Sequence, residues 1–438
     1  MKTIKNRPHY NLMSVQGIQL DQYKSTLDEQ IMMRGVKFET RDIPISPYPY
    51  IVSSEVSAKL DASCSVLHRV VEKVVSQYKT DTKIQGYMNL HKKFHDLVLK
   101  SPVTKPCVMF CRFDFCLVDS QMKLYEVNSA CPAGLQISRD VYSAYVSSDI
   151  INDLNINYNL GLKAFPVNIQ DSFTMLVKAA LKETDIKFDK SLTVGLLNSK
   201  HNTMINELKS FKQELNREDI NCEIGFVEDV EYRDGSMFLN QKRVDACFQK
   251  FDNNVHSDDY QTAFSKNKEE VADYIQAVED NAVIQINPFS SMFVGESKTL
   301  LALIKEPSFN YLFDEEELKV IEEVVPDTRK CSDENVKMAV AMKDDWILKR
   351  SLDTRGRNVI IGRECSQHDW QLRLEQAAVE NADYVLQHCH IAEKSTSYYT
   401  TQALFMIAGK PIGMISRTSA NKVTNVGKNG FVQLTLLC

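Results

Sequence analysis

Two short apolar runs that each carry a polar pair constrain the fold more than any other feature of the chain. They lie within RFDFCLVDSQMKLYEVN at residues 112–128. Alternation of apolar and polar residues with a period of two predicts two strands joined by a turn. Arg112, Asp114, Glu126 and Asn128 all occupy even positions. The polar pair of each strand is therefore expected to share one face.

The length of the turn decides whether the two acids meet. A three-residue turn at 119–121 places Asp114 opposite Glu126, and Arg112 opposite Asn128, in an antiparallel pair. A turn of two or four residues without a bulge would separate them onto opposite faces. Like charges opposed at about 5 Å destabilise a sheet, so the three-residue turn requires a compensating positive charge.

Two kinds of site meet this requirement. A divalent cation such as Mg²⁺ takes oxygen ligands of the kind that Asp, Glu and Asn supply, and it usually shares them with substrate phosphates. The alternative is a solvated sheet face on which Arg112 pairs with an acid. Spacing alone leaves both interpretations open.

Composition excludes several classes of protein. A chain of 438 residues with 43% hydrophobic residues is long enough for two or three domains. A formal charge of -6 argues against nucleic-acid binding, which needs a concentrated basic surface. No apolar stretch reaches the length of a membrane span, and the first residues lack the apolar core of a signal peptide, so a cytoplasmic protein is expected.

The cysteines and histidines predict no metal centre. None of the 11 cysteines is spaced as CxxC, and reduced, mostly buried thiols are expected. Cys131 lies close to the acidic strands and is interpreted as structural. His388 and His390 form an HxH pair, but no third ligand is apparent.

Four regions are predicted along the chain. Residues 1–104 have a mostly helical pattern, and 105–189 contain the two acidic strands. Residues 190–290 alternate strands with helices, as in TVGLLN followed by TMINELKSFKQELNRE, which is typical of a small parallel α/β unit inserted in the chain. Residues 291–438 form the last region, for which further strands and helices are predicted.

Basic residues near a glycine-bearing loop form a second group of candidates. Lys349 ends a strand, WILK, and the loop TRGRN follows it. Such a loop can cover phosphates with backbone N–H groups while a strand lysine reaches phosphate oxygens. With one glycine, a plain hairpin explains the loop equally well. Lys298 starts an apolar helix, and Arg417 and Asn425 lie in a late polar run.

The order of these motifs resembles that of the circularly permuted ATP-grasp ligases, the group that includes glutathionylspermidine synthetase. RFDF, YEVN, TVGLLN, SKTLLAL, WILKRSLDTRGRNV and YVLQ follow one another as the corresponding motifs do in that group. The resemblance runs from about residue 105 to the C-terminus. It implies an α+β/α/β architecture, an ATP-grasp fold with permuted motif order and an inserted, pre-grasp-like parallel α/β domain.

The resemblance also implies roles for individual residues. The metal ligands would be Asp114, Glu126 and Asn128, with Asn425 as a weaker candidate. The catalytic arginines would be Arg112, aimed at the reacting phosphoryl group, and Arg417. The residues that bind ATP would be Lys298, Lys349, the loop residues Arg355, Gly356 and Asn358, and Gln387 beside adenine.

The implied activity is ADP-forming ligation that uses ATP and Mg²⁺. An amino-acid or peptide carboxylate would become an acyl phosphate, and an amine or a carrier-protein phosphopantetheine thiol would then displace phosphate. The thiol case resembles the L-glutamate:acyl-carrier-protein ligase of butirosin-type aminoglycoside biosynthesis. A noncatalytic nucleotide-binding scaffold is the alternative from another class.

The segment after the acidic strands is expected to shape a substrate pocket. Gly134 would permit a close turn there. Arg139 could pair with a substrate carboxylate, although an ordinary helix-surface arginine is the slightly favoured interpretation.

Overall fold

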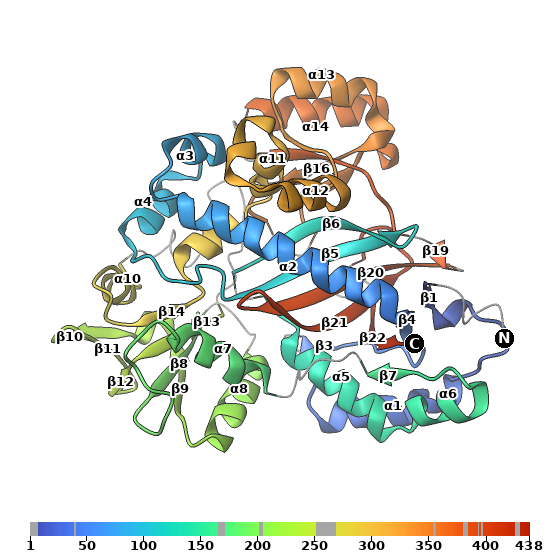
Figure 1. Cartoon of the computed structure of the whole chain (residues 1–438), viewed down its shortest axis with the longest axis horizontal. Coiled ribbons are helices and arrows are strands. Elements are labelled where there is room, and N and C mark those ends of the chain that lie inside the picture. Colours follow the sequence, from blue (N-terminus) through green and yellow to red (C-terminus); the bar gives the residue numbers. More distant parts are fainter. Residues whose placement is uncertain are drawn as a thin grey trace.

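The computed structural model has a mixed α/β fold with several sheets (Figure 1). It describes residues 8–38, 41–130, 132–164, 171–200, 205–250, 269–353, 356–379, 384–392, 394–395, 397–424 and 430–438.

A nine-stranded sheet forms the centre of the described structure. Its strands along the main path are β1 (His9–Asn11), β4 (Tyr50–Val52), β22 (Phe431–Leu437), β21 (Lys410–Ser419), β20 (Tyr398–Ile407), β5 (Phe110–Val118) and β6 (Gln121–Asn128). Two short strands join it at the side, β19 (Lys394–Ser395) on β20 and β7 (Lys163–Ala164) on β22. The acidic strands β5 and β6 therefore form one edge, beside strands from the end of the chain.

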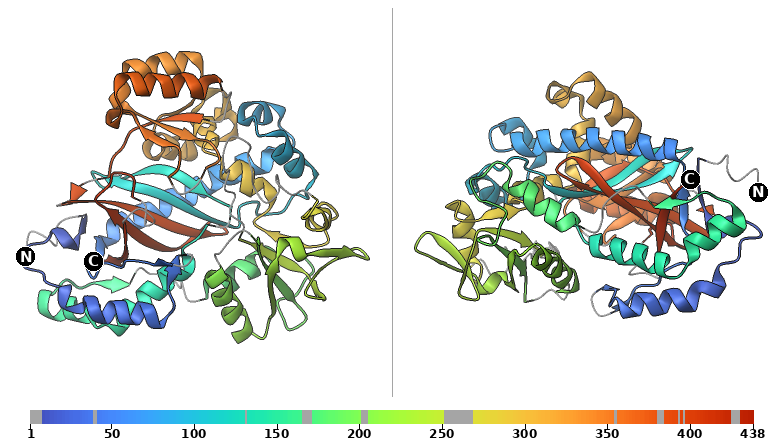
Figure 2. Two further views of the ribbon diagram at one scale, coloured as in Figure 1. Left: turned by 180° about the vertical axis from the view of Figure 1, so that it is seen from behind. Right: turned by 60° about the horizontal axis from the view of Figure 1, so that its bottom comes forward.

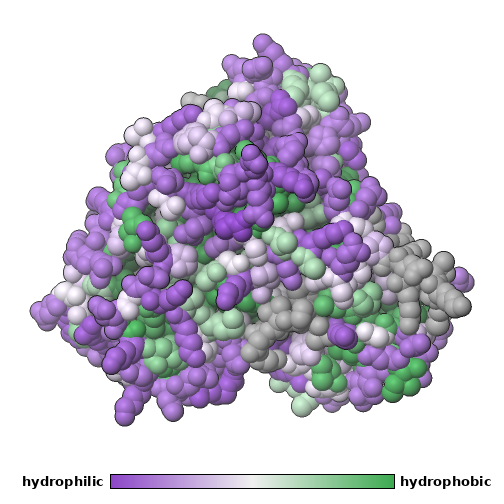
Figure 3. All heavy atoms as spheres, in the orientation of Figure 1, coloured by the Kyte–Doolittle hydropathy of each residue, from purple (hydrophilic) through white to green (hydrophobic). Residues whose placement is uncertain are grey.

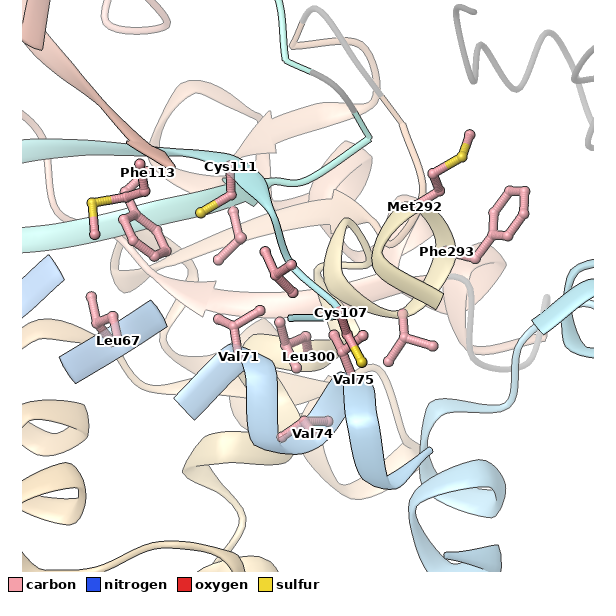
Figure 4. Packing of buried hydrophobic residues seen from close by; sticks show 14 of the residues in the cluster. Leu67, Val71, Val74, Val75, Cys107, Cys111, Phe113, Met292, Phe293 and Leu300 are labelled. Atoms are coloured by element: carbon pink, nitrogen blue, oxygen red, sulfur yellow. The ribbon is translucent and has the colours of Figure 1, made fainter. Parts of the chain in front are cut away.

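One face of this sheet packs against the long helix α2 (Ser54–Gln77) (Figure 4). The helix begins where Ser53 accepts a hydrogen bond from the N–H of Val56, an ordinary N-cap. Its apolar stripe, which includes Leu67 and Val71, meets Phe113 of β5 in one buried cluster. The odd-numbered residues of β5 thus face the core, as the alternation predicts.

The opposite face of the sheet packs against helices α1 (Lys24–Met33), α5 (Leu135–Ser147) and α6 (Ile150–Tyr158), which lie on the other side from α2 in Figure 2. Leu135 and Val141 of α5 share a buried cluster with Phe405 of β20. Even-numbered residues of β5, including Arg112 and Asp114, belong to this face, just beyond the start of α5.

A four-stranded parallel sheet occupies the middle of the chain, with the order β14-β13-β8-β9. Its strands are β8 (Thr193–Asn198), β9 (Asn221–Phe226), β13 (Ala246–Gln249) and β14 (Ile284–Ile286), and the helices around it are α7 (Ser172–Leu181), α8 (Ile205–Arg217) and α10 (Ala272–Glu279). A small sheet of β10 (Glu231–Arg233), β11 (Ser236–Leu239) and β12 (Lys242–Val244) follows β9. The predicted strand TVGLLN is confirmed as β8.

A second four-stranded sheet, antiparallel in the order β15-β18-β16-β17, carries Lys349 and Gln387. Its strands are β15 (Thr328–Lys330), β16 (Trp346–Arg350), β17 (Val359–Ile361) and β18 (Tyr384–His388), and α13 (Asp333–Ala341) and α14 (Gln367–Val379) lie over it (Figure 1). Helices α11 (Thr299–Lys305) and α12 (Glu315–Val324) precede it along the chain.

The remaining described elements are short. YMNLHKKFHDLVLK forms two helices, α3 (Thr82–Met88) and α4 (Lys92–Lys100), because Asn89 adopts a left-handed conformation that ends the first. A two-stranded sheet joins β2 (Lys37–Phe38) to β3 (Arg41–Asp42). The short 3-10 helices are η1 (Leu12–Ser14), η2 (Asp21–Tyr23), η3 (Val227–Asp229), η5 (Pro307–Leu312), η6 (Lys343–Asp345) and η7 (Gly362–Glu364), and η4 (Ser291–Gly295) is a short π-helix.

Ion pairs connect α12 to α2. Arg69 pairs with Glu316 at 2.5 Å, and Lys73 pairs with the buried Glu317 at 2.5 Å. Charged partners keep this surface polar, and Figure 3 shows mostly hydrophilic residues on the face that α2 crosses. Among the described helices, none is both long and apolar enough to cross a bilayer.

The packing of α2 predicts a clear stability effect. Leu67→Ala removes a fully buried side chain and should lower the free energy of unfolding by about 2–5 kcal/mol. Lys59→Ala, at an exposed position of the same helix, should change it by about 0.5 kcal/mol or less. Urea denaturation followed by circular dichroism measures both, and equal effects would contradict the packing described for α2.

Candidate active site

The hairpin of β5 and β6 brings the two acids together, by a route that differs from the sequence prediction. Asp114 lies opposite Glu126, and Arg112 lies opposite Asn128, as predicted. The turn has two residues, Asp119–Ser120, rather than the three that would give this pairing without a bulge, because Val118 pairs with Gln121.

A bulge in β6 restores the predicted register. Asp119 and Ser120 have φ of 49° and 65°, the left-handed pair of a tight two-residue hairpin turn. The pairing then shifts between Asp114 and Phe115, where Tyr125 is the extra residue of β6. The bulge returns Glu126 to the same face as Asp114. One extra residue in the strand thus replaces one residue in the turn.

Two arginines neutralise Asp114, which is buried. Arg112 donates from Nε to Oδ1 at 2.7 Å and from Nη2 to Oδ2 at 2.9 Å, and Arg417 Nη2 lies 3.0 Å from Oδ2. Burial alone would raise the pKa of Asp114, but the two guanidinium groups outweigh burial and lower this pKa. Asp114 is therefore an anion in the folded chain.

Small residues on β20 let Arg417 reach Asp114 across the intervening strand. Ala403 is the neighbour of Asp114, and Thr401 is the neighbour of Arg417. Neither side chain is long enough to separate the arginine from the acid. Arg112 also donates from Nη1 to the carbonyl oxygen of Ala133, at 2.6 Å.

Two lysines connect the acidic hairpin to the second antiparallel sheet. Lys298 Nζ lies 3.3 Å from Oε2 of Glu126 and donates to the carbonyl oxygen of Asp353 at 2.8 Å. Lys349 Nζ donates to the carbonyl oxygen of Tyr125 at 3.2 Å. Burial lowers the pKa of Lys349 to about 8; Glu126 opposes this shift and Lys298 adds to it.

Gln387 is buried beside Lys349. Its Oε1 accepts from Lys349 Nζ at 2.6 Å, and its Nε2 donates to Oγ1 of Thr328 at 3.2 Å. Both ends of the amide are therefore engaged within the sheet, so the side chain orients Lys349. The predicted contact of this position with adenine stays a prediction.

The described part of the glycine-bearing loop is tied to Asp353. Asn358 Nδ2 donates to Oδ2 of Asp353 at 2.7 Å, and Arg357 Nε lies 3.3 Å from Oδ1. Gly356 has φ of 66°, a left-handed conformation that favours glycine. Three residues considered from the sequence lie outside the described residues: Arg355, Asn425 and Cys131.

Asn287 is a structural residue that the sequence does not reveal. Its Oδ1 accepts from the N–H groups of Met109 and Phe110, at 3.1 and 2.9 Å, and its Nδ2 donates to the carbonyl oxygen of Ser129 at 2.8 Å. One fully buried amide thus connects the start of β5 with the end of β6. In the sequence this asparagine only marks a break before Pro288.

Glu296 is a third acid of the candidate site, and the sequence analysis did not identify it. Its Oε2 accepts from the N–H groups of Ser129 and Ala130, at 2.5 and 2.9 Å. Burial raises its pKa, which those two amides and Lys298 oppose. Its place two residues before Lys298 is the sequence signal that could have identified it.

Two other expectations have different outcomes. Gly134 has φ of 110° and begins α5, which confirms the close turn. Arg139 is neither a surface residue nor directed at a vacant pocket, because it lies 3.4 Å from Glu214 and 3.5 Å from Asp140 in a largely buried cluster. The ion pair of Arg139 with Glu214 connects α5 to α8.

The histidine pair shows no metal site. The rings of His388 and His390 lie 5.0 Å apart, and His388 also contacts Trp346. Across the described residues, no group of three or more His, Cys, Asp or Glu side chains is arranged to hold a metal ion by themselves. Any metal at Asp114 and Glu126 would need the asparagine or a ligand as well.

Comparison with known protein families identifies the family of the chain. A family model described as Glutathionylspermidine synthase preATP-grasp matches residues 21–432. The chain belongs to this family. The resemblance of motifs starts at about residue 105, whereas the family model matches from residue 21. The family match therefore includes most of the helical N-terminal region.

A solved structure shares the fold at low sequence identity. A glutathione synthetase-like effector, GSS30, from Globodera pallida is 13% identical, with a TM-score of 0.60 over 96% of this chain and 97% of that one. A protein described as gamma-glutamylcysteine synthetase from Methylobacillus flagellatus is 12% identical, with a TM-score of 0.43 over 85% and 88% of the two chains. No curated protein sequence matches significantly.

The charge arrangement predicts that Asp114 is important for stability. Asp114→Asn leaves two guanidinium groups close together and partly buried, and should lower the free energy of unfolding by about 3–5 kcal/mol.

Asp327→Asn is the matched control. Arg329 contacts Asp327 through the same two-residue spacing, at 2.7–3.1 Å, but that pair is about 40% exposed. Its loss should cost about 1 kcal/mol or less. Chemical denaturation of both variants compares them, and a small effect of Asp114→Asn would contradict the buried ion-pair account.

Proposed function

We propose that this chain is an ATP-dependent, ADP-forming carboxylate ligase that uses Mg²⁺. The observation that carries the proposal is the meeting of Asp114 and Glu126 on one sheet face, beside Lys298 from the start of α11 and Lys349 from β16 of the second sheet. Opposed acids with two lysines beside them suit a metal–nucleotide complex. Family membership supports the same function.

The residues present fit such a complex. Asp114, Glu126 and Asn128 offer the hard oxygen ligands that Mg²⁺ prefers. The three arginine contacts to Asp114 use three of its roughly four acceptor positions, which leaves one. The side-chain nitrogen of Asn128 is buried and has no hydrogen-bond partner in the described structure, so a polar ligand would satisfy it.

The chain's own residues have complementary roles in this proposal. Asp114, Glu126 and Asn128 would hold Mg²⁺, and the bound ion would neutralise negative charge on the phosphates of ATP. Lys298 and Lys349 bind the nucleotide phosphates, Gln387 orients Lys349, and the loop at 355–358 covers the phosphates. In this proposal, phosphoryl transfer depends on charges held in fixed positions and not on a general base.

The proposed reaction has two steps. A carboxylate oxygen of the acyl substrate attacks the γ-phosphorus of ATP, and ADP leaves, while Arg112 and Arg417 stabilise the transferring phosphoryl group. An amine nitrogen then attacks the carbonyl carbon of the acyl phosphate. The C–N bond forms, the C–O bond to phosphate breaks, and one proton of the amine ends on the departing phosphate. The preferred acyl substrate is an amino-acid or peptide carboxylate.

The proposal includes the finer architecture as well. The chain would be a permuted ATP-grasp fold in which the parallel sheet of β8, β9, β13 and β14 is an inserted pre-grasp-like domain. Two features support this interpretation: the acidic hairpin precedes that sheet in the chain, and the strand that carries Lys349 follows it.

ADP release tests the function. The purified chain is incubated with Mg–ATP, hydroxylamine, and glutamate, γ-glutamylcysteine or glutathione as the carboxylate. Hydroxamate formation coupled to ADP supports the ligase. An arm with phosphopantetheinylated carrier protein and glutamate tests thioester formation. ATP binding without turnover in any arm would favour the scaffold alternative, and no binding at all would refute both.

A charge-removing variant tests the metal set. Glu126→Gln should lower kcat for hydroxamate formation by about 100-fold or more, because the transition state loses a fixed charge. Glu322→Gln also removes an acid paired with a lysine, but on the exposed surface, and should leave kcat unchanged. Full activity of Glu126→Gln would remove this residue from the site.

The pKa of Lys349 predicts a pH dependence of ATP affinity. Burial lowers this pKa to about 8 in the free chain, and bound phosphates should raise it, so binding takes up a proton above pH 8. The Kd for ATP should rise as the pH goes from 8 to 9.5, by up to about tenfold per unit.

Lys349→Gln should abolish this dependence, while Lys330→Gln should retain it. Lys330 is a matched control because burial also lowers its pKa and it lies in the same sheet, where it contacts Tyr87. Isothermal titration calorimetry at several pH values measures the affinities. A flat profile for the unmodified chain would contradict the role of Lys349.

A further inference from the structure

Three buried side chains of the parallel sheet and its helix α10 form a hydrogen-bonded network. They are Gln249 at the end of β13, Gln285 of β14 and Tyr274 of α10. The hydroxyl of Tyr274 donates to Oε1 of Gln249, and Nε2 of Gln285 donates to the Tyr274 oxygen at 2.9 Å. Cys247 pairs with Gln285 and lies two residues before Gln249, so both glutamines share one face of the sheet.

Backbone groups fix the orientation of both glutamine amides. Nε2 of Gln249 donates to the carbonyl oxygen of Asn287 at 2.5 Å, so its Oε1 is turned toward Tyr274. Oε1 of Gln285 accepts from the N–H of Phe289 at 3.1 Å, so its Nε2 is turned toward the same hydroxyl. Every polar atom of the three side chains therefore has a partner. A buried polar network that is satisfied in this way specifies one geometry.

The network reaches the acidic hairpin through Asn287. The side chain of Asn287 bonds to backbone groups of Phe110, at the start of β5, and of Ser129, directly after β6. Phe110 lies four residues before Asp114 in the same strand. Gln249 thus holds the backbone of the residue whose side chain joins the two ends of the hairpin.

The hairpin needs such a joint because its register opposes like charges. Asp114 and Glu126 repel each other across the pair, which favours separation of β5 from β6. A small separation disturbs a metal site, whose ligands must be held within about 0.5 Å of their productive positions. Hydrogen bonds behind the metal ligands set their orientation, and the loss of such bonds lowers metal affinity.

We propose that Gln249 is a positioning residue for the proposed metal ligands Asp114, Glu126 and Asn128. It acts through Asn287, so the parallel sheet controls the metal affinity of a hairpin that belongs to another sheet. This inference rests on the proposed function, because it requires the hairpin to hold Mg²⁺.

Metal binding tests the proposal without turnover. Gln249→Leu removes both hydrogen-bonding groups and keeps a side chain of similar size. Mn²⁺ is titrated into the chain with saturating adenylyl imidodiphosphate, and the electron paramagnetic resonance signal of the free ion gives the Kd. This Kd should rise about tenfold in Gln249→Leu, as it does on loss of other groups that orient metal ligands.

Gln433→Leu is the matched control. Gln433 is also fully buried, its Nε2 donates to the carbonyl oxygen of Tyr48 at 2.9 Å, and its Oε1 accepts from Asn11 at 3.2 Å. It belongs to β22, which β21 and β20 separate from β5. Gln433→Leu should lower the melting temperature about as much as Gln249→Leu does, but it should leave the Kd for Mn²⁺ unchanged.

A smaller change keeps the test valid if Gln249→Leu does not fold. Tyr274→Phe removes only the hydroxyl that donates to Gln249, and the Kd for Mn²⁺ should rise about threefold. Tyr145→Phe removes another buried hydroxyl, which donates to the carbonyl oxygen of Ser46, and should leave this Kd unchanged.

Hydrogen exchange measures the joint itself in the metal-free chain. The amides of Met109 and Phe110 donate to Asn287, so they should exchange faster in Tyr274→Phe than in Tyr145→Phe. Mass spectrometry of the peptides that contain these residues measures the rates. Equal rates in the two variants would contradict the connection between the network and the hairpin.

The outcomes separate this proposal from the proposed function. An unchanged Kd for Mn²⁺ in Tyr274→Phe, or an equal rise in the two control variants, would overturn the role of Gln249 even if the chain proves to be a ligase. Failure of the unmodified chain to bind Mn²⁺ with the nucleotide analogue would instead refute the metal site on which the proposal rests.

Discussion

The opposition of Asp114 and Glu126 across one hairpin is the constraint on which the rest of the structure depends. Two acids on neighbouring strands repel each other, so this register persists only with positive charge around it. That charge comes from separate segments of the chain: Arg112 on β5, Arg417 on β21 and Lys298 before α11. In the proposed function, the same charges that stabilise the hairpin would also bind phosphate.

The scaffold around the hairpin fixes these charges in place. Helix α2 packs on one face of the sheet and α5 on the other, and the hydrogen bonds of Asn287 hold the two acidic strands at their ends. The segment from Asn287 to Lys298 therefore brings a lysine and an additional acid to the end of the hairpin. The stability of the hairpin and the proposed chemistry of the site therefore depend on the same contacts.

Much of this could be predicted from sequence because it depends on local periodicity. Alternation in β5 and β6 predicts the strands and their shared face, and the motif order predicts the family. The combination of a two-residue turn with a bulge was not predicted. It gives the same pairing of Asp114 with Glu126 as a three-residue turn without a bulge, so the sequence pattern does not distinguish them. The contacts of Asn287 and Glu296 join residues more than 150 positions apart, and no local pattern encodes them.

Crystallography with Mn²⁺ and a nonhydrolysable ATP analogue tests the central claim most directly. Mn²⁺ replaces Mg²⁺ at oxygen sites and gives an anomalous signal that locates the ion without assumptions about the ligands. The account predicts an anomalous peak within coordination distance of Asp114 and Glu126, with the phosphates between the hairpin and Lys349. A nucleotide bound elsewhere, or a bound nucleotide with no Mn²⁺ at these acids, would contradict it.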